Sequence, residues 1–83
     1  MFSAYIIEST TTGRSYYGHT KDLDQRLSDH NSGRSHFTHG KGPWKPIAFS
    51  SHASRSEATE MERSLKNARN KMYALKLIGA QPG

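Results

Sequence analysis

The chain contains no cysteine, so neither a disulfide framework nor a cysteine-based zinc site is available to it. It also lacks any long hydrophobic run. The apolar opening, residues 1–8, is too short for a membrane span and carries no basic segment of the kind that begins a signal peptide. We therefore expect a cytoplasmic protein without membrane contact.

Acidic residues are missing from two long stretches of the chain. Twelve Lys and Arg stand against seven Asp and Glu, and none of these acids lies between His30 and Ser56 or after Glu62. A polyanionic partner is favoured, because each phosphate that the protein neutralises releases condensed counterions. The residues that we expect to contact nucleic acid are Lys21, Arg34, His36, His39, Lys41, Lys45, Lys66 and Arg69.

Eighty-three residues are enough for one domain, 1–83, with one small core. Hydrophobic periodicity and turn signals predict strands at 2–8, 14–18 and 47–52, and helices at 22–31, from Ser54 or Ser56 onward, and at 70–77. The helix at 22–31 is capped by Thr20 or Asp22, whereas the glycine- and proline-containing segment 34–46 is expected to be a loop. The predicted fold class is α/β (α+β): a small three-stranded, mainly antiparallel sheet flanked by helices.

Polar residues interrupt the apolar stripe of the first helix. Leu23, Arg26, Leu27 and His30 are spaced i, i+3, i+4 and i+7, so they share one side of the helix. If the leucines face the core, the guanidinium and the imidazole lie beside the sheet. That placement costs stability unless the two groups find partners or a ligand.

Glu62 repeats this anomaly on the second helix, where it lies among apolar neighbours. One interpretation is an ion pair between Arg26 and Glu62. The other is a site for phosphodiester hydrolysis, which needs an activated water and stabilisation of negative charge. Arginine binds phosphate bidentately, a carboxylate holds hydrated Mg²⁺, and tyrosine or histidine carries a proton.

The order of short motifs along nearly the whole chain resembles the GIY-YIG endonucleases, particularly their compact stand-alone bacterial members, which are similar to the N-terminal nuclease domain of UvrC. The resemblance is carried by Tyr5, Tyr16-Tyr17-Gly18, Asp22-Leu23, Arg26, His30-Asn31, Gly42-Pro43-Trp44, Ser56-Glu57-Ala58 and Glu62.

The resemblance implies the activity and the role of each matching residue. The activity is that of a DNA endonuclease that depends on one Mg²⁺ or Mn²⁺ ion, has little sequence preference, binds through backbone phosphates, and serves DNA repair or the processing of branched DNA. The implied site consists of Tyr5 or Tyr16 or His30 as general base, with Tyr5 preferred, Arg26 as the phosphate clamp, Glu62 as the metal ligand and Gly18 as a structural glycine. Arg26 is also expected to lower the pKa of the tyrosine. We expect a monomer.

Some positions depart from the family pattern. Ser and Ala at 3–4 replace a glycine and an aliphatic residue, and Tyr17 replaces an isoleucine. A helper asparagine of some members corresponds to Ala74, so it is absent or supplied by Asn67 or Asn70. None of these changes removes a proposed reacting group.

Several aromatic residues and histidines admit structural roles. Trp44 is expected to close the core, although it could instead stack on a base. Tyr73 could serve either in packing or in binding. The spacing of the histidines matches no common zinc pattern. The residues expected simply to pack are Tyr17, Phe49, Met72 and Leu75.

Two other functions stay open at the level of the sequence. The first is a catalytically weak nucleic-acid-binding module that kept the fold. The second is a structural domain that binds acidic proteins, for which affinity would not depend on phosphate.

Overall fold

The computed structural model describes residues 1–32 and 40–79, so the expected nucleic-acid contacts Arg34, His36 and His39 lie outside the described residues. The elements follow the order β1 (Phe2–Ser9), β2 (Ser15–Thr20), α1 (Leu23–Ser32), β3 (Trp44–His52), α2 (Arg55–Lys66) and α3 (Lys71–Gly79). Within the described ranges, no helix is both long and apolar enough to cross a membrane. The predicted α+β fold class is confirmed.

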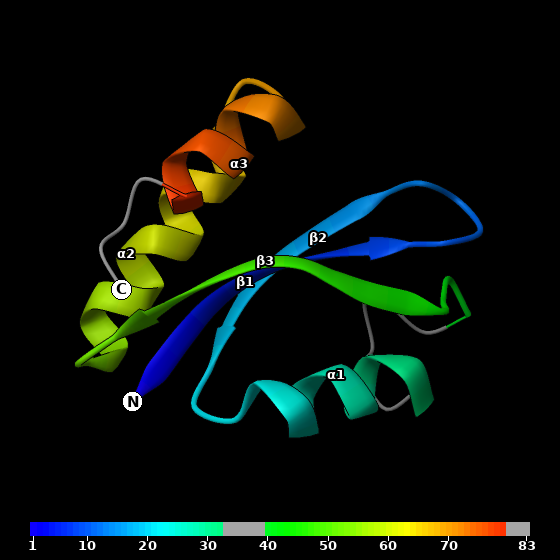
Figure 1. The fold of residues 1–83 in the computed structure, drawn as a ribbon, viewed down its shortest axis with the longest axis horizontal. Helices are drawn as coiled ribbons and strands as arrows, with labels where there is room; N and C mark the ends of the chain where they lie inside the picture. The colour runs from blue at the N-terminus through cyan, green and yellow to red at the C-terminus, as the bar shows by residue number, and fades with distance from the viewer. Residues whose placement is uncertain (33–39, 80–83) are drawn as a thin grey trace.

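The three strands form one antiparallel sheet with β1 in the middle, in the order β2-β1-β3. Helix α1 covers one face, and α2 and α3 lie together on the other (Figure 1). Because successive side chains of a strand point to opposite faces, the central strand contributes to both sides. This explains why residues 4–7 of β1 are all buried.

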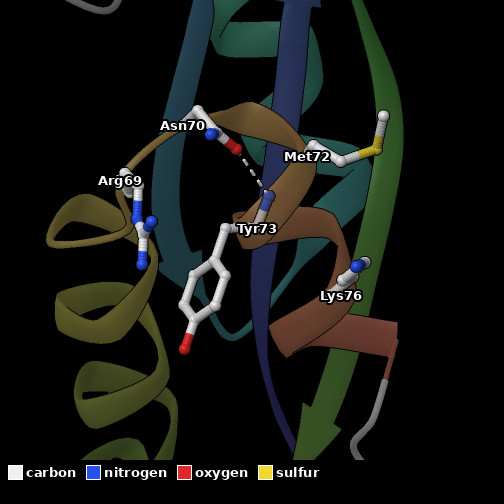
Figure 2. Close-up of a pocket in the computed structure, with 5 residues that line it drawn as sticks. All are labelled: Arg69, Asn70, Met72, Tyr73 and Lys76. Carbon is white, nitrogen blue, oxygen red and sulfur yellow. Dashed lines mark hydrogen bonds between the residues drawn. The ribbon is translucent and has the colours of Figure 1, made fainter.

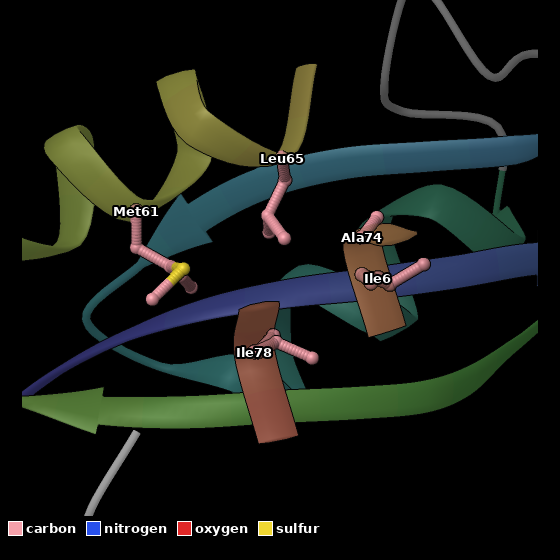
Figure 3. Packing of buried hydrophobic residues seen from close by; sticks show 6 residues of the cluster. Ile6, Met61, Leu65, Ala74 and Ile78 are labelled. Carbon is pink, nitrogen blue, oxygen red and sulfur yellow. The ribbon is translucent and has the colours of Figure 1, made fainter. Parts of the chain in front are cut away.

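Two hydrophobic clusters therefore lie on the two faces of β1. Ala4 and Ile6 point toward α2 and α3, where Leu65 and Ile78 are among the residues that enclose them (Figure 3). The second cluster, on the α1 face, consists of Tyr5, Ile7 and Trp44 with partly buried Tyr16, Leu23 and Leu27. The prediction that Trp44 packs in the core is confirmed, because only 5% of this residue is exposed.

The third strand begins earlier than predicted. Trp44, Lys45 and Pro46 were expected in a loop, but they pair with β1 opposite Ser9, Glu8 and Ile7. Proline is tolerated here because β3 is an edge strand, where a missing N–H need not break the ladder. In addition, the Asn31 side chain accepts a hydrogen bond from the Trp44 N–H (2.6 Å) and donates one to its carbonyl (3.0 Å). This pairing ties α1 to β3.

Two of the residues expected to pack are exposed instead. Phe49 is 59% exposed and Met72 is 67% exposed. Phe49 lies on an edge strand and Met72 in the first turn of α3, and neither position is enclosed by other elements. By contrast, Tyr17 and Leu75 do pack against the α2/α3 cluster, as predicted.

Side-chain caps begin each helix. Asp22 accepts from the Gln25 N–H (3.1 Å), which selects Asp22 over Thr20 as the cap of α1. Ser54 accepts from the Glu57 N–H (3.2 Å), as the Ser-x-x-Glu pattern predicts. Helix α3 is capped in the same way by Asn70.

Gly18 is required because the side chain of Tyr5 crosses β2 at this position. The two residues are partners in the β1–β2 register. A Cβ atom at Gly18 would lie 2.5 Å from the Tyr5 hydroxyl oxygen and 2.7 Å from its Cζ. Any side chain here would therefore displace the tyrosine.

We expect Gly18→Ala to lower the free energy of unfolding by about 1–3 kcal/mol, as overpacking does in other cores. Gly79→Ala is the matched control, because its new Cβ would meet no atom within 4 Å. Urea denaturation of the two variants and the parent measures the difference. Equal stability of both variants would contradict the close approach of Tyr5 to β2.

Candidate active site

Four of the residues selected from the sequence gather on the α1 face of the sheet. Tyr5 faces Gly18 and Ile7 faces Tyr16 in the register, so the two tyrosines share this face. The Tyr5 hydroxyl lies 3.0 Å from Nε2 of His30, and the rings of Tyr16 and His30 are 5.0 Å apart in an edge-on arrangement. Tyr5 is 1% exposed and His30 is 2% exposed.

Arg26 completes this cluster. Its interactions with Tyr5 and Tyr16 raise the pKa of its guanidinium. The Tyr5 hydroxyl and Nε2 of His30 form a hydrogen bond in which the tautomer of His30 sets the donor. With Nδ1 protonated, the Tyr5 hydroxyl donates and Nε2 accepts.

Burial controls the acid–base properties of this cluster. It lowers the pKa of His30 to about 4, with the Arg26 charge acting in the same direction. Burial also raises the pKa of Tyr5, and Arg26 offsets only part of this effect. Arg26 therefore acts in the expected direction, but desolvation, which depends on the tertiary structure, outweighs it.

Glu62 reaches the site from α2, on the other side of the sheet. Its Oε1 lies 2.6 Å from Nδ1 of His19, and its Oε2 lies 2.8 Å from Nζ of Lys66. These contacts, rather than the alternative ion pair with Arg26, satisfy the carboxylate. The charge of Glu62 nevertheless acts to raise the pKa of Tyr5, so the two groups interact electrostatically around the edge strand β2.

His19 is a site residue that the sequence analysis missed. The predicted strand ended at Gly18, which left His19 in a connecting segment, whereas β2 continues to Thr20. In a strand, His19 points to the face opposite Gly18, and that is the α2 face. Extending the predicted strand by two residues would have placed this imidazole beside the second helix.

A hydrated divalent cation fits the donor set that Glu62 offers. Burial acts to raise the pKa of this carboxyl, but hydrogen bonds from Lys66 and His19 outweigh it, so its pKa lies below the ordinary value. The group is thus an ionised hard oxygen donor, of the kind that holds Mg²⁺ while the ion keeps most of its waters. Residues 1–32 and 40–79 contain no cluster of three or more His, Asp or Glu side chains suited to a metal. A site here would therefore rest on one carboxylate.

Next to this cluster, Arg26 lines an open hollow of about 350 Å³ at the junction of β2 and α1. The expected phosphate contact Lys21 also lines it, together with His19. A second residue that the sequence analysis missed is Arg55, which lines the same hollow with its guanidinium carbon 5.0 Å from the centre of the Phe2 ring. Cationic side chains from the β2–α1 connection, from α1 and from α2 thus line one concave surface.

The remaining expected contacts are exposed and form two groups, one next to Glu62 and one away from the candidate site. Lys66 and Arg69 continue from Glu62 to the end of α2 and beyond it. Lys41 and Lys45 lie toward the β1–β2 turn, where Lys45 is paired in register with Glu8. The structure therefore brings Lys21 and Lys66 to the candidate site but not Lys41 or Lys45.

Comparison with known proteins identifies the same fold and motif order elsewhere. The model of the GIY-YIG catalytic domain matches residues 1–74. The UPF0213 protein BH0048 of Halalkalibacterium halodurans is 36% identical over 64 residues, which cover 76% of this chain and 67% of the relative. A UPF0213 protein of Listeria welshimeri is 41% identical over 59 residues, which cover 69% of this chain and 66% of the relative.

A solved structure agrees with these matches. The solution NMR structure of the UPF0213 protein BH0048 from Bacillus halodurans superimposes with a TM-score of 0.56 at 30% identity, covering 100% of this chain and 88% of that one. The chain spans about two thirds of the length of the curated relatives that it matches. With the family domain matched over residues 1–74 and the same fold in a homologue, the chain belongs to the GIY-YIG family of nucleases.

Proposed function

We propose that this protein is a DNA endonuclease that hydrolyses phosphodiester bonds with the help of one Mg²⁺ or Mn²⁺ ion. The observation that carries the proposal is the buried hydrogen bond between Tyr5 and His30 beside Arg26, with the Glu62 carboxylate around the edge of β2. A proton acceptor, a cation for phosphate and an anionic metal ligand thus lie in one region.

The groups of the site that solvent can reach, beginning with Arg26, bind the substrate. Arg26 is oriented by Tyr5 and Tyr16, so its remaining N–H groups can engage a phosphate with little loss of side-chain freedom. Lys21 and Arg55 extend this positive surface. Contacts of this kind are made to the DNA backbone, and we therefore propose little sequence preference.

Tyr5 and His30 act together as the base. A neutral tyrosine with a raised pKa is a poor base by itself. Its oxygen accepts a proton from water as its own proton passes to Nε2 of His30, so no tyrosinate has to form. The hydroxide bonds to phosphorus, the P–O bond to the leaving oxygen breaks, and solvent protonates that oxygen. The charge gained by His30 is balanced by the bound phosphate.

Glu62 is the residue that would hold the metal ion. The ion supplies positive charge against the phosphate oxygens and the leaving oxygen. His19 and Lys66 hold the carboxylate on either side and keep it ionised. A role in DNA repair or in processing branched DNA is proposed from the family resemblance alone.

The rival function is a DNA-binding module with little catalysis. In its favour, Tyr5 and His30 are almost completely buried, which restricts the access of water to the Tyr5 hydroxyl. Against it, a module that only binds would not need an Arg–Tyr–His chain beneath its surface. Cleavage assays decide between the two functions.

For Glu62→Gln, we expect Mg²⁺-dependent nicking of plasmid DNA to fall by on the order of 100-fold or more, because an anionic ligand is replaced by a neutral amide of equal size. Glu60→Gln is the matched control, since this glutamate is exposed on the same helix. Nicking that survives Glu62→Gln would contradict the metal assignment. Tight DNA binding by a parent protein that never nicks would favour the rival.

For Tyr5→Phe, we expect the single-turnover cleavage rate to fall by about 10²- to 10⁴-fold, the range for loss of a general base. DNA affinity should remain within about twofold of the parent, because Arg26 is retained. Tyr17→Phe, which removes a hydroxyl on the opposite face of the sheet, serves as the control. Equal rates for the two variants would exclude Tyr5 from proton transfer.

The buried imidazole also predicts a pH dependence of stability. In the folded protein the pKa of His30 is about 4, below the ordinary 6.5, so the unfolded chain binds the proton first. The contribution is fully present above pH 6.5 and is lost as the pH falls toward 4, by up to about 3 kcal/mol. In chemical denaturation, His30→Gln should remove this part of the slope. Parallel curves for parent and variant would contradict the low pKa.

A further inference from the structure

A second concave surface lies at the start of α3, away from the Tyr5–His30 cluster. It is a hollow of about 230 Å³ lined by Arg69, Asn70, Met72, Tyr73 and Lys76. Figure 2 shows the Tyr73 ring projecting from α3, with Arg69 on one side of it and Lys76 on the other. Tyr73 is 47% exposed and Met72 is 67% exposed, so both offer apolar surface to a ligand.

The charges around this hollow have one sign. Arg69 and Lys76 line it, and no carboxylate does so among the residues that the structure describes. The hollow beside Arg26 differs, because Asp22 and Asp29 also line that one. Downstream of Glu62 the sequence contains no acidic residue at all. This hollow therefore favours an anionic ligand more than an ordinary protein surface does.

The hollow is connected to the candidate active site along α2. Lys66 follows Glu62 by one helical turn and forms an ion pair with its carboxylate. The neighbouring Tyr16 acts to raise the pKa of Lys66. Arg69 lies just beyond the end of that helix. Cationic side chains thus follow one another from the proposed metal ligand to Tyr73, in the way that a nucleic-acid backbone requires.

The rigidity of this surface also suits recognition. The Asn70 side chain accepts a hydrogen bond from the Tyr73 N–H (2.9 Å), which fixes the first turn of α3 (Figure 2). An exposed aromatic ring between cations binds a planar base by stacking while the cations contact its phosphates. The hollow is smaller than the roughly 300–1,000 Å³ of a site for a drug-sized ligand, which suits one base.

We propose that this hollow binds an unpaired nucleotide of the DNA substrate, with its base on Tyr73 and its phosphates on Arg69 and Lys76. The inference rests on the proposed nuclease function and deepens it by naming a substrate class. In a blunt duplex the bases are stacked inside the helix and unavailable to Tyr73. The preferred substrate is therefore a duplex with an unpaired strand, such as a flap, beside the cleavage site.

The test uses fluorescence anisotropy with two labelled DNAs, a blunt duplex and the same duplex carrying an unpaired flap. All proteins carry Glu62→Gln so that binding is measured without cleavage. Adding Tyr73→Leu should weaken binding to the flapped DNA by about 5- to 100-fold, the effect of losing one stacked base. Affinity for the blunt duplex should stay within about twofold. Tyr73→Phe should bind both DNAs as the parent does.

Phe49→Leu provides the matched control, because Phe49 is an exposed aromatic residue on β3 outside this hollow. It should change neither affinity. Equal binding of both DNAs by the parent, or an equal effect of Tyr73→Leu on both, would overturn the inference. So would a change of oligomeric state in Tyr73→Leu, measured by sedimentation, which would assign the hollow to contacts between copies of the chain.

Failure of this inference is distinguishable from failure of the nuclease function. If the protein without Glu62→Gln nicks plasmid DNA and Tyr73→Leu has no effect on flap binding, only the nucleotide site is wrong. If that protein neither binds nor cleaves any of these DNAs, the nuclease function and the nucleotide site are both wrong.

Discussion

The hydrogen bond from Tyr5 to His30 is the interaction on which the candidate active site depends. It joins the central strand to α1 beneath the surface, and both partners are almost completely buried. Buried polar groups are costly unless they are hydrogen-bonded, and this bond gives each of the two side chains a partner. The arrangement is possible only because Gly18 leaves room for the tyrosine to cross β2. Both the stability of the fold and the geometry of the candidate active site thus depend on the close approach of Tyr5 to Gly18.

Burial has opposite effects on the pKa values of the two partners. It raises the pKa of Tyr5 and lowers the pKa of His30 to about 4, so both groups are neutral at pH 7. When the Tyr5 oxygen takes a proton from water as its own proton passes to His30, no tyrosinate forms and only His30 becomes charged. This explains how a poor base such as tyrosine serves in the proposed reaction, with the cost of charging His30 offset by a phosphate next to Arg26.

The edge strand β2 divides the candidate site between the two faces of the sheet. Gly18 belongs to the face of Tyr5, whereas His19 points to the α2 face and binds Glu62. Both halves meet at this edge because β2 is an outer strand of the sheet formed by the described residues. Polar residues placed within an apolar stripe, as Arg26 and Glu62 are, usually reduce stability, and proteins keep such conflicts mainly where function needs them. The same logic applies to the exposed aromatic ring of Tyr73.

The sequence by itself determined the order of strands and helices, the helix caps and the out-of-pattern residues Arg26, His30 and Glu62. These features depend on local periodicity and on hydrogen bonds between near neighbours. All the residues that decide them lie within one short segment of the chain. The strand start at Trp44 was not predictable, because only the edge position of β3 makes Pro46 acceptable there.

Only the tertiary structure decided which side chains meet. The hairpin register placed Tyr5 and Tyr16 on one face, since a slip of one residue would have separated them. Packing of α2 against β2 gave Glu62 its partner His19, and desolvation determined the direction of the Tyr5 pKa. Each of these depends on distances between segments far apart in the chain, and spacing along the sequence does not contain those distances.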